Sequence, residues 1–226
     1  MCNRLIIGGV AKDIHMGTTT NCTVYSPELV NIIRNFKHVH IGLSVESFHD
    51  INDYVRWPSS ISDIKENIFK FLEMREEMGM HLALRITPNI FTIYHLDTVF
   101  DFMIQHSISA ESCNILYDPS CLWIELLPTE LILTALGKIN AVIHKHGLIP
   151  STAIMVNRRR DDLVGDVIAD VIFEYKNFLE NCSPPTDVES ERYKLVKFIK
   201  AFESLRHNKI IDYLPEYEEF LRSYGY

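Results

Sequence analysis

Strand-like and helix-like segments alternate along the first 150 residues, and this alternation constrains the fold more than any other feature of the sequence. Apolar residues occupy every second position from Val39 to Val45, which predicts a strand at 38–46, and a second strand is expected at 81–86. Between them, apolar residues recur at helical spacing, which predicts a helix at about 60–78 that ends at Gly79. This order predicts βαβ units, and therefore an α/β fold with parallel strands.

The other segments continue the pattern. Ser26 and Pro27 are typical of a helix start, because Ser is a good N-cap and Pro is favoured at the first helical position. We therefore divide the chain into an α/β part, 1–150, and a charged helical C-terminal extension, 151–226. The remaining expected elements are a strand at 17–24, a helix at 96–106, short strands at 112–117 and 121–127, a helix from 128 to about 146, a break at 181–187 and a terminal helix at about 214–224.

Composition excludes some classes of partner. Lys and Arg total 22 against 30 for Asp and Glu, a net charge of −8, so the basic field of a nucleic-acid-binding protein is not indicated. Apolar runs such as Leu5–Ile7 are far shorter than a membrane span, and the start of the chain lacks the features of a secretory signal. We therefore expect no membrane association and a cytoplasmic location. The five cysteines show no metal-ligand spacing and are expected to be reduced; they are Cys2, Cys22, Cys113, Cys121 and Cys182.

Ligand sites of parallel sheets lie beyond the carboxyl ends of the strands. This rule predicts a functional rim formed by four segments. They are Asn21–Val24, Ser44–Ser47, Thr87–Asn89 and Tyr117–Asp118.

Three polar groups on or beside this rim are candidates for binding. Asn21, within Thr20–Thr23, indicates either a polar cradle or a simple turn. Ser44 and Glu46 suit the diol of a ribose, or else mark a solvated strand end. Arg56 is able to clamp a carboxylate, or else forms a surface ion pair with Asp50 or Asp53.

Histidine is not expected to bind a metal here. His38 and His40 alternate with apolar residues and so lie on one face of a strand, but no Cys or acidic ligand stands at metal spacing beside them. We interpret both as structural or solvated side chains, and we expect no metal ligands in the chain.

In sequence order, these segments resemble a twitch-type radical S-adenosylmethionine (SAM) protein, from about residue 16 onward. Residues 20–23 resemble a "TNGT" element, 41–47 an "isiDg" strand, and 52–59 an "ndyiR-gs" segment. Further matches lie at 64–68 ("i.eNi"), 114–119 and 126–128 (closing strands), and 202–206 with 211–216 ("lD..R...i.dy.PEl").

The resemblance implies a partial (β/α)6 barrel of the TIM-barrel type. It also implies a 4Fe-4S cluster held by CxxxCxxC, and SAM, whose reductive cleavage starts hydrogen abstraction from an unknown substrate. Ser44 would contact SAM at its ribose, Glu46 stands where Asp is usual, and Arg56 would lie near the SAM carboxylate. Asn21 would belong to the polar rim.

The chain departs from the family in the elements that hold the cofactors. It contains no CxxxCxxC and no GGEP strand, and Cys22 replaces a glycine. We therefore expect an N-terminally truncated barrel that is not competent alone, with its other half on another polypeptide or with another protein partner. The alternatives are a non-catalytic binding or partner-interaction domain derived from that barrel, and an unrelated α/β domain. A second cluster at Cys113, Cys121 or Cys182 stays open.

Overall fold

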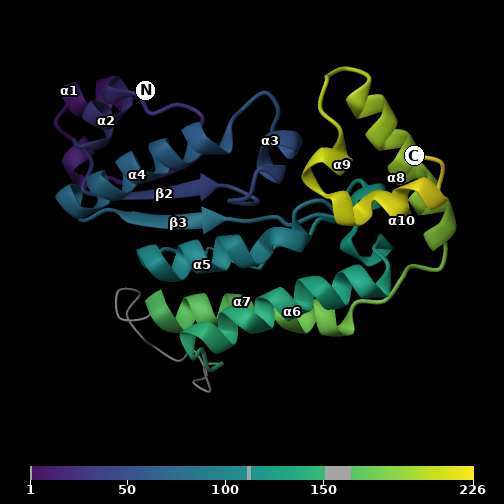
Figure 1. Ribbon diagram of the computed structural model, residues 1–226. Helices are drawn as coiled ribbons and strands as arrows, with labels where there is room; N and C mark the ends of the chain where they lie inside the picture. The colour runs from purple at the N-terminus through teal and green to yellow at the C-terminus, as the bar shows by residue number, and fades with distance from the viewer. Residues whose placement is uncertain (1, 111–112, 151–163) are drawn as a thin grey trace.

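The computed structural model describes residues 2–110, 113–150 and 164–226, and it shows an α/β fold built on a parallel sheet (Figure 1). The four strands pair in sequence order, each parallel to its neighbour. This confirms the expected α/β class and parallel pairing. The strands are β1 (His15–Thr20), β2 (His38–Ser44), β3 (His81–Arg85) and β4 (Ser109–Ala110).

Helices connect successive strands, as the alternation predicted. The Ser26 hydroxyl caps the first connecting helix by accepting from the backbone N–H of Leu29 (3.3 Å). Gly79 ends the longest one with a left-handed φ of 61°, a conformation that glycine adopts without strain. The helices of this part are α1 (Cys2–Ile7), α2 (Pro27–Ile33), α3 (Ile51–Val55), α4 (Ile61–Met78) and α5 (Leu96–His106), with 3-10 turns η1 (Ala11–Asp13) and η2 (Ile93–His95).

The two faces of the sheet differ in chemistry. Val39, Ile41 and Leu43 of β2 are at most 5% exposed and belong to the hydrophobic core. The alternate residues of the same strand, from His38 to Ser44, lie on the opposite face. Parallel sheets usually bury apolar residues on both faces, so this polar face is a feature of the molecule that needs an explanation.

Two expected strands are wrong. Residues 113–117 have no regular structure, and 3-10 turns occupy η3 (Ser120–Leu122) and η4 (Ile124–Leu126). The apolar residues Ile124 and Leu126 are buried, but under a helix of the C-terminal region, whose Arg192 donates to the carbonyl of Leu126 (2.8 Å). A short apolar run indicates that its residues are buried, but it does not show whether their backbone is a strand or a 3-10 turn. The expected strand at 17–24 begins earlier and ends at Thr20, and residue 112 lies outside the described residues.

From residue 164 onward the C-terminal region is helical, and besides the contact of α8 with η3 and η4 it meets the α/β part through α7 and through its last helices. The helix α7 packs against β4, α5 and α6, beside the short edge strand. The last helices gather beyond the arrowheads of β2 and β3, beside α3 (Figure 1). None of the described helices is both long and apolar enough to cross a membrane. The helix α6 (Thr129–His146) is the last of the α/β part, and the C-terminal elements are α7 (Val164–Asn181), α8 (Val188–Glu203), α9 (Ile210–Tyr213), η6 (Pro215–Tyr217) and α10 (Glu218–Ser223).

Tyr175 of α7 joins this helix to the end of β3. Its buried hydroxyl accepts from the backbone N–H of Asn114 (3.1 Å) and lies 3.2 and 3.3 Å from the carbonyl oxygens of Asn114 and Ile86. We expect Tyr175→Phe to lower the free energy of unfolding by about 1–3 kcal/mol, because it removes a buried hydroxyl together with its hydrogen bonds to Asn114 and Ile86. Urea unfolding followed by circular dichroism measures this. Tyr193→Phe is the control, since Tyr193 is 53% exposed, and equal effects of the two changes would contradict the prediction.

Candidate functional site

Three of the residues predicted from the sequence meet at the carboxyl end of β2. Ser44 is the last residue of that strand, and Glu46 follows two positions later. Arg56 directly follows α3, where its backbone N–H donates to the carbonyl of Asn52 (2.8 Å) and its carbonyl accepts from the Ser59 hydroxyl (2.6 Å). These backbone contacts hold the Arg56 main chain in place and so position its side chain.

The Arg56 guanidinium binds Glu46 with two nitrogen atoms. Nε donates to one carboxylate oxygen, and Nη2 donates to the other at 2.5 Å. Nη2 also lies 3.4 Å from the Ser44 hydroxyl. The side chains of Arg56 and Glu46 are only 22% and 14% exposed, so the pair is largely shielded from solvent.

The electrostatics keep Arg56 ionised. Burial alone would lower the pKa of Arg56, but the hydrogen bonds and negative charge of Glu46 outweigh burial and raise it. The two aspartates considered as partners of Arg56 are engaged elsewhere. Asp53 accepts from the backbone N–H of Ile61 (2.5 Å) at the start of α4, and Asp50 pairs with His49.

Asn21 lies apart from this cluster. Its side-chain oxygen accepts from the backbone N–H (3.2 Å) and the hydroxyl (2.8 Å) of Thr23, and all of these groups are exposed. The structure therefore shows Asn21 in a local turn, the simpler of the two readings of this segment.

Cys22, the next residue, is the member of this loop that lies close to Arg56. Its side chain is fully buried and its φ is 61°. Burial raises the pKa of the Cys22 thiol to about 12, and the Arg56 charge and the backbone of Ser44 offset only part of this effect. Asn67 of α4 donates to the Cys22 carbonyl (3.0 Å) and so holds the loop against the helix.

Arg85 is a second guanidinium at the same edge, and the sequence reasoning missed it. Arg85 is the last residue of β3, and it is exposed. It is paired in register with Ser44 of β2, so both residues lie on the polar face of the sheet. The alternation within 81–86 contained the signal, because it places Arg85 on the face opposite the buried Leu84. The other rim segments have local roles: Asn89 accepts from the backbone N–H of Phe91 (2.9 Å), and the Tyr117 carbonyl accepts from the indole of Trp123 (2.8 Å).

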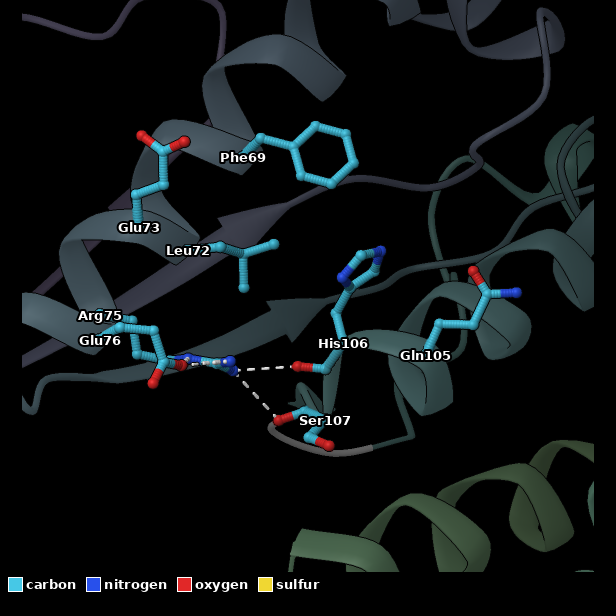
Figure 2. Close-up of a pocket in the computed structure, with 8 residues that line it drawn as sticks. All are labelled: Phe69, Leu72, Glu73, Arg75, Glu76, Gln105, His106 and Ser107. Atoms are coloured by element: carbon cyan, nitrogen blue, oxygen red, sulfur yellow. Dashed lines mark hydrogen bonds and ion pairs between the residues drawn. The ribbon is translucent and has the colours of Figure 1, made fainter.

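A pocket of about 420 Å³ lies elsewhere, between α4 and α5 (Figure 2). Its lining comes from the second half of α4, from Phe69 to Glu76, and from the end of α5, and both helices end near the amino edge of the sheet, away from Ser44. Inside it, Arg75 Nη1 donates to the carbonyls of His106 (3.1 Å) and Ser107 (3.3 Å), as Figure 2 shows. These contacts satisfy the last carbonyls of α5, and we interpret this Arg as structural.

The cysteines do not fit an iron–sulfur cluster. A 4Fe-4S cluster of the implied type needs three converging thiolates. All five cysteines are free, and the described residues contain no group of three or more Cys, His, Asp or Glu side chains placed to hold a metal. Burial also raises the pKa of Cys113 to about 11 and raises those of Cys121 and Cys182, which disfavours their thiolate forms.

A stacked histidine pair lies near the rim. The rings of His49 and His95 are parallel within 2° and their centroids are 3.7 Å apart. Burial, with the charges of His49 and Lys138, lowers the pKa of His95 to about 3, so this ring stays neutral in the folded chain near neutral pH.

His95 is therefore expected to make the fold sensitive to acid. Between pH 6.5 and about 3 the unfolded chain binds a proton at His95 that the folded chain does not, so stability falls as the pH is lowered through this window. We expect His95→Phe to reduce the loss of unfolding free energy between pH 7 and pH 4.5 by about 1–2 kcal/mol. Urea unfolding at the two pH values measures this. An unchanged pH dependence, or an equal change in the exposed control His207→Phe, would argue against it.

No protein-family model matches the sequence, and no curated protein is significantly similar to it. The geometry at the carboxyl end of β2 is therefore the main basis for a functional assignment.

Proposed function

We propose that this chain is a binding domain for a small ligand that carries hydroxyl groups and a carboxylate, with SAM as the first candidate. The observation that carries the proposal is the convergence of Ser44, Glu46 and Arg56 at the carboxyl end of a parallel strand. A serine hydroxyl and a carboxylate bind a diol, and a guanidinium binds a carboxylate. Carboxyl ends of parallel strands are also where ligands of such sheets bind.

The fold supports the same proposal. Four parallel strands with helical connections, and one face lined by polar residues, are what a partial (β/α)6 barrel of the radical SAM type would present. The resemblance of the sequence to twitch-type radical SAM proteins supplies SAM as the candidate, with Ser44 toward the ribose and Arg56 toward the carboxylate.

The hydrogen bonds of Arg56 indicate which of its nitrogen atoms would bind such a ligand. Nε and Nη2 hold Glu46, which keeps the guanidinium in one orientation. Nη1 has no bonded partner among the described residues, so the ligand carboxylate would accept hydrogen bonds there. Ser44, and Arg85 beside it in register, would complete the polar surface under the ligand.

Reductive cleavage of SAM is not part of this proposal. The cysteines of the chain do not fit the cluster that such chemistry needs, so we derive no step through it. The proposed role corresponds to a non-catalytic binding domain with the arrangement of part of that barrel.

Calorimetric titration tests the proposal directly. We expect the purified chain to bind SAM, and to bind 5′-methylthioadenosine at least tenfold more weakly because it lacks the carboxylate. Ser44→Ala and Arg56→Met should weaken SAM binding. Arg34→Met should leave it unchanged, because Arg34 forms an exposed ion pair with Glu77 on the helices. Absence of SAM binding to the folded chain would overturn SAM as the ligand.

Anaerobic reconstitution with iron and sulfide distinguishes binding from catalysis. For a binding domain we expect no stable cluster and no 5′-deoxyadenosine after SAM and a reductant are added. A stable cluster with SAM cleavage would instead make this chain a radical SAM enzyme with cysteine ligands outside the usual motif.

A further inference from the structure

Four histidines share the polar face of the sheet near the amino ends of the strands. The register pairs His15 of β1 with His38 of β2, and His40 of β2 with His81 of β3. Paired residues, and residues two apart on one strand, lie on the same face. The ring centroids are 4.5 Å apart in the first pair and 4.7 Å apart in the second. This grouping explains part of the polar character of a face that parallel sheets usually bury.

The second pair has the geometry of two ligands of one ion. The Nδ1 atoms of His40 and His81 are 2.8 Å apart, and their ring planes differ by 18°. Two imidazole nitrogens bound to one tetrahedral zinc ion at about 2.0–2.1 Å are separated by about 3.3 Å. The two nitrogens therefore stand about 0.5 Å closer than two zinc ligands, so a small rotation of the rings would let both bind one ion in place of their hydrogen bond.

The residues around this histidine pair leave space for an ion and supply a candidate third ligand. Gly17 pairs with His40 on the other side, and a Cβ atom added to it would meet nothing within 4 Å. His38 is exposed and stands two positions before His40 on the same face, so a change of rotamer away from the His15 ring would bring its ring toward the same point. The described residues hold no preassembled group of three ligands, so this rotation is the step that completes the site.

We propose that His40, His81 and His38 bind a borderline divalent metal ion of the zinc class on the polar face of the sheet. Imidazole is a preferred ligand of such ions, and three protein ligands leave a position for water. The site is separate from the proposed ligand site, because Ser44 lies four residues beyond His40, about 13 Å along the strand. The sequence alone did not indicate this site, because His15 and His81 join the group only through strand pairing.

Zinc titration of the untagged chain by calorimetry tests the proposal. We expect one equivalent of Zn²⁺ to bind the wild-type chain, and His40→Gln and His81→Gln to weaken its affinity at least tenfold each. His38→Gln should also weaken it. His207→Gln is the matched control, because His207 is exposed in the C-terminal region, and it should bind like the wild type.

A spectroscopic measurement on the wild-type chain keeps the test independent of how the variants fold. Zn²⁺ should shift the imidazole carbon and proton resonances of His40 and His81 in NMR spectra, and leave those of His207 in place. Absence of saturable binding, equal affinity in His40→Gln, or binding without a shift of the His40 and His81 signals would each overturn the proposal.

Discussion

Arg56→Met is expected to lower the free energy of unfolding by about 2–4 kcal/mol. The reason is the state of Glu46, which is 14% exposed and would lose the guanidinium that holds both of its oxygens. Removing one partner of a buried ion pair leaves an uncompensated charge, which costs more than the pair contributes. Urea unfolding followed by circular dichroism measures the loss, and SAM binding to the same variant should fall at least tenfold if the proposed function holds.

Two further variants separate this charge effect from general damage. Arg56→Met combined with Glu46→Gln should recover part of the lost stability, because no buried charge remains unpaired. Arg34→Met should change stability by no more than about 0.5–1 kcal/mol, since Arg34 and Glu77 are 50% and 59% exposed. If Arg56→Met were no more damaging than Arg34→Met, the buried pair would have no structural role.

Tyr217→Ala is expected to destabilise the chain by about 3–5 kcal/mol. The side chain is 1% exposed, its hydroxyl donates to the carbonyl of Ile90 (2.9 Å), and its ring meets Tyr94 edge-on at 5.8 Å. Truncating a buried aromatic residue removes burial and leaves a cavity. Tyr217→Phe should cost less, about 1–2 kcal/mol, because it removes only the hydrogen bond.

The same unfolding experiment tests whether the C-terminal helices and the sheet unfold together. Tyr217 and Ile90 lie on opposite sides of the boundary at residue 150, as do Phe202 and Tyr54, whose rings are 5.6 Å apart. We therefore expect one unfolding transition that moves as a whole in Tyr217→Ala. Leu205→Ala, at a residue that is 79% exposed, should leave it in place. Two separate transitions would show that the helices unfold as an independent domain.

The elements predicted correctly are those whose signals are local. The helix α5 was expected at 96–106 and occurs there, and α4 begins and ends within a residue of its expected bounds, with Gly79 as its stop. Capping, helical spacing and strand alternation all act within a few residues, so a single sequence contains them. The expected strand at 121–127 failed because its apolar residues Ile124 and Leu126 are buried beneath α8, which is distant in the sequence.

In the candidate site, too, the sequence indicated some features, and only the structure showed the others. Ser44 and Glu46 were recognisable because they lie at the end of a predicted strand, where ligands of parallel sheets bind, and Arg56 because it lies in the loop segment that follows this strand. That Arg56 bonds to Glu46 and that Arg85 lies beside Ser44 are consequences of contacts between separate segments.

By itself, the sequence therefore determined the α/β class, the parallel direction of the strands and the residue types at the carboxyl edge of the sheet. Only the tertiary structure decided which of these residues meet, and it also placed His40 against His81 across 41 residues of chain. The physical reason is the sequence separation over which each interaction acts. Periodicity and capping are properties of neighbouring residues, whereas strand register and the pairing of buried charges depend on the packing of the whole chain.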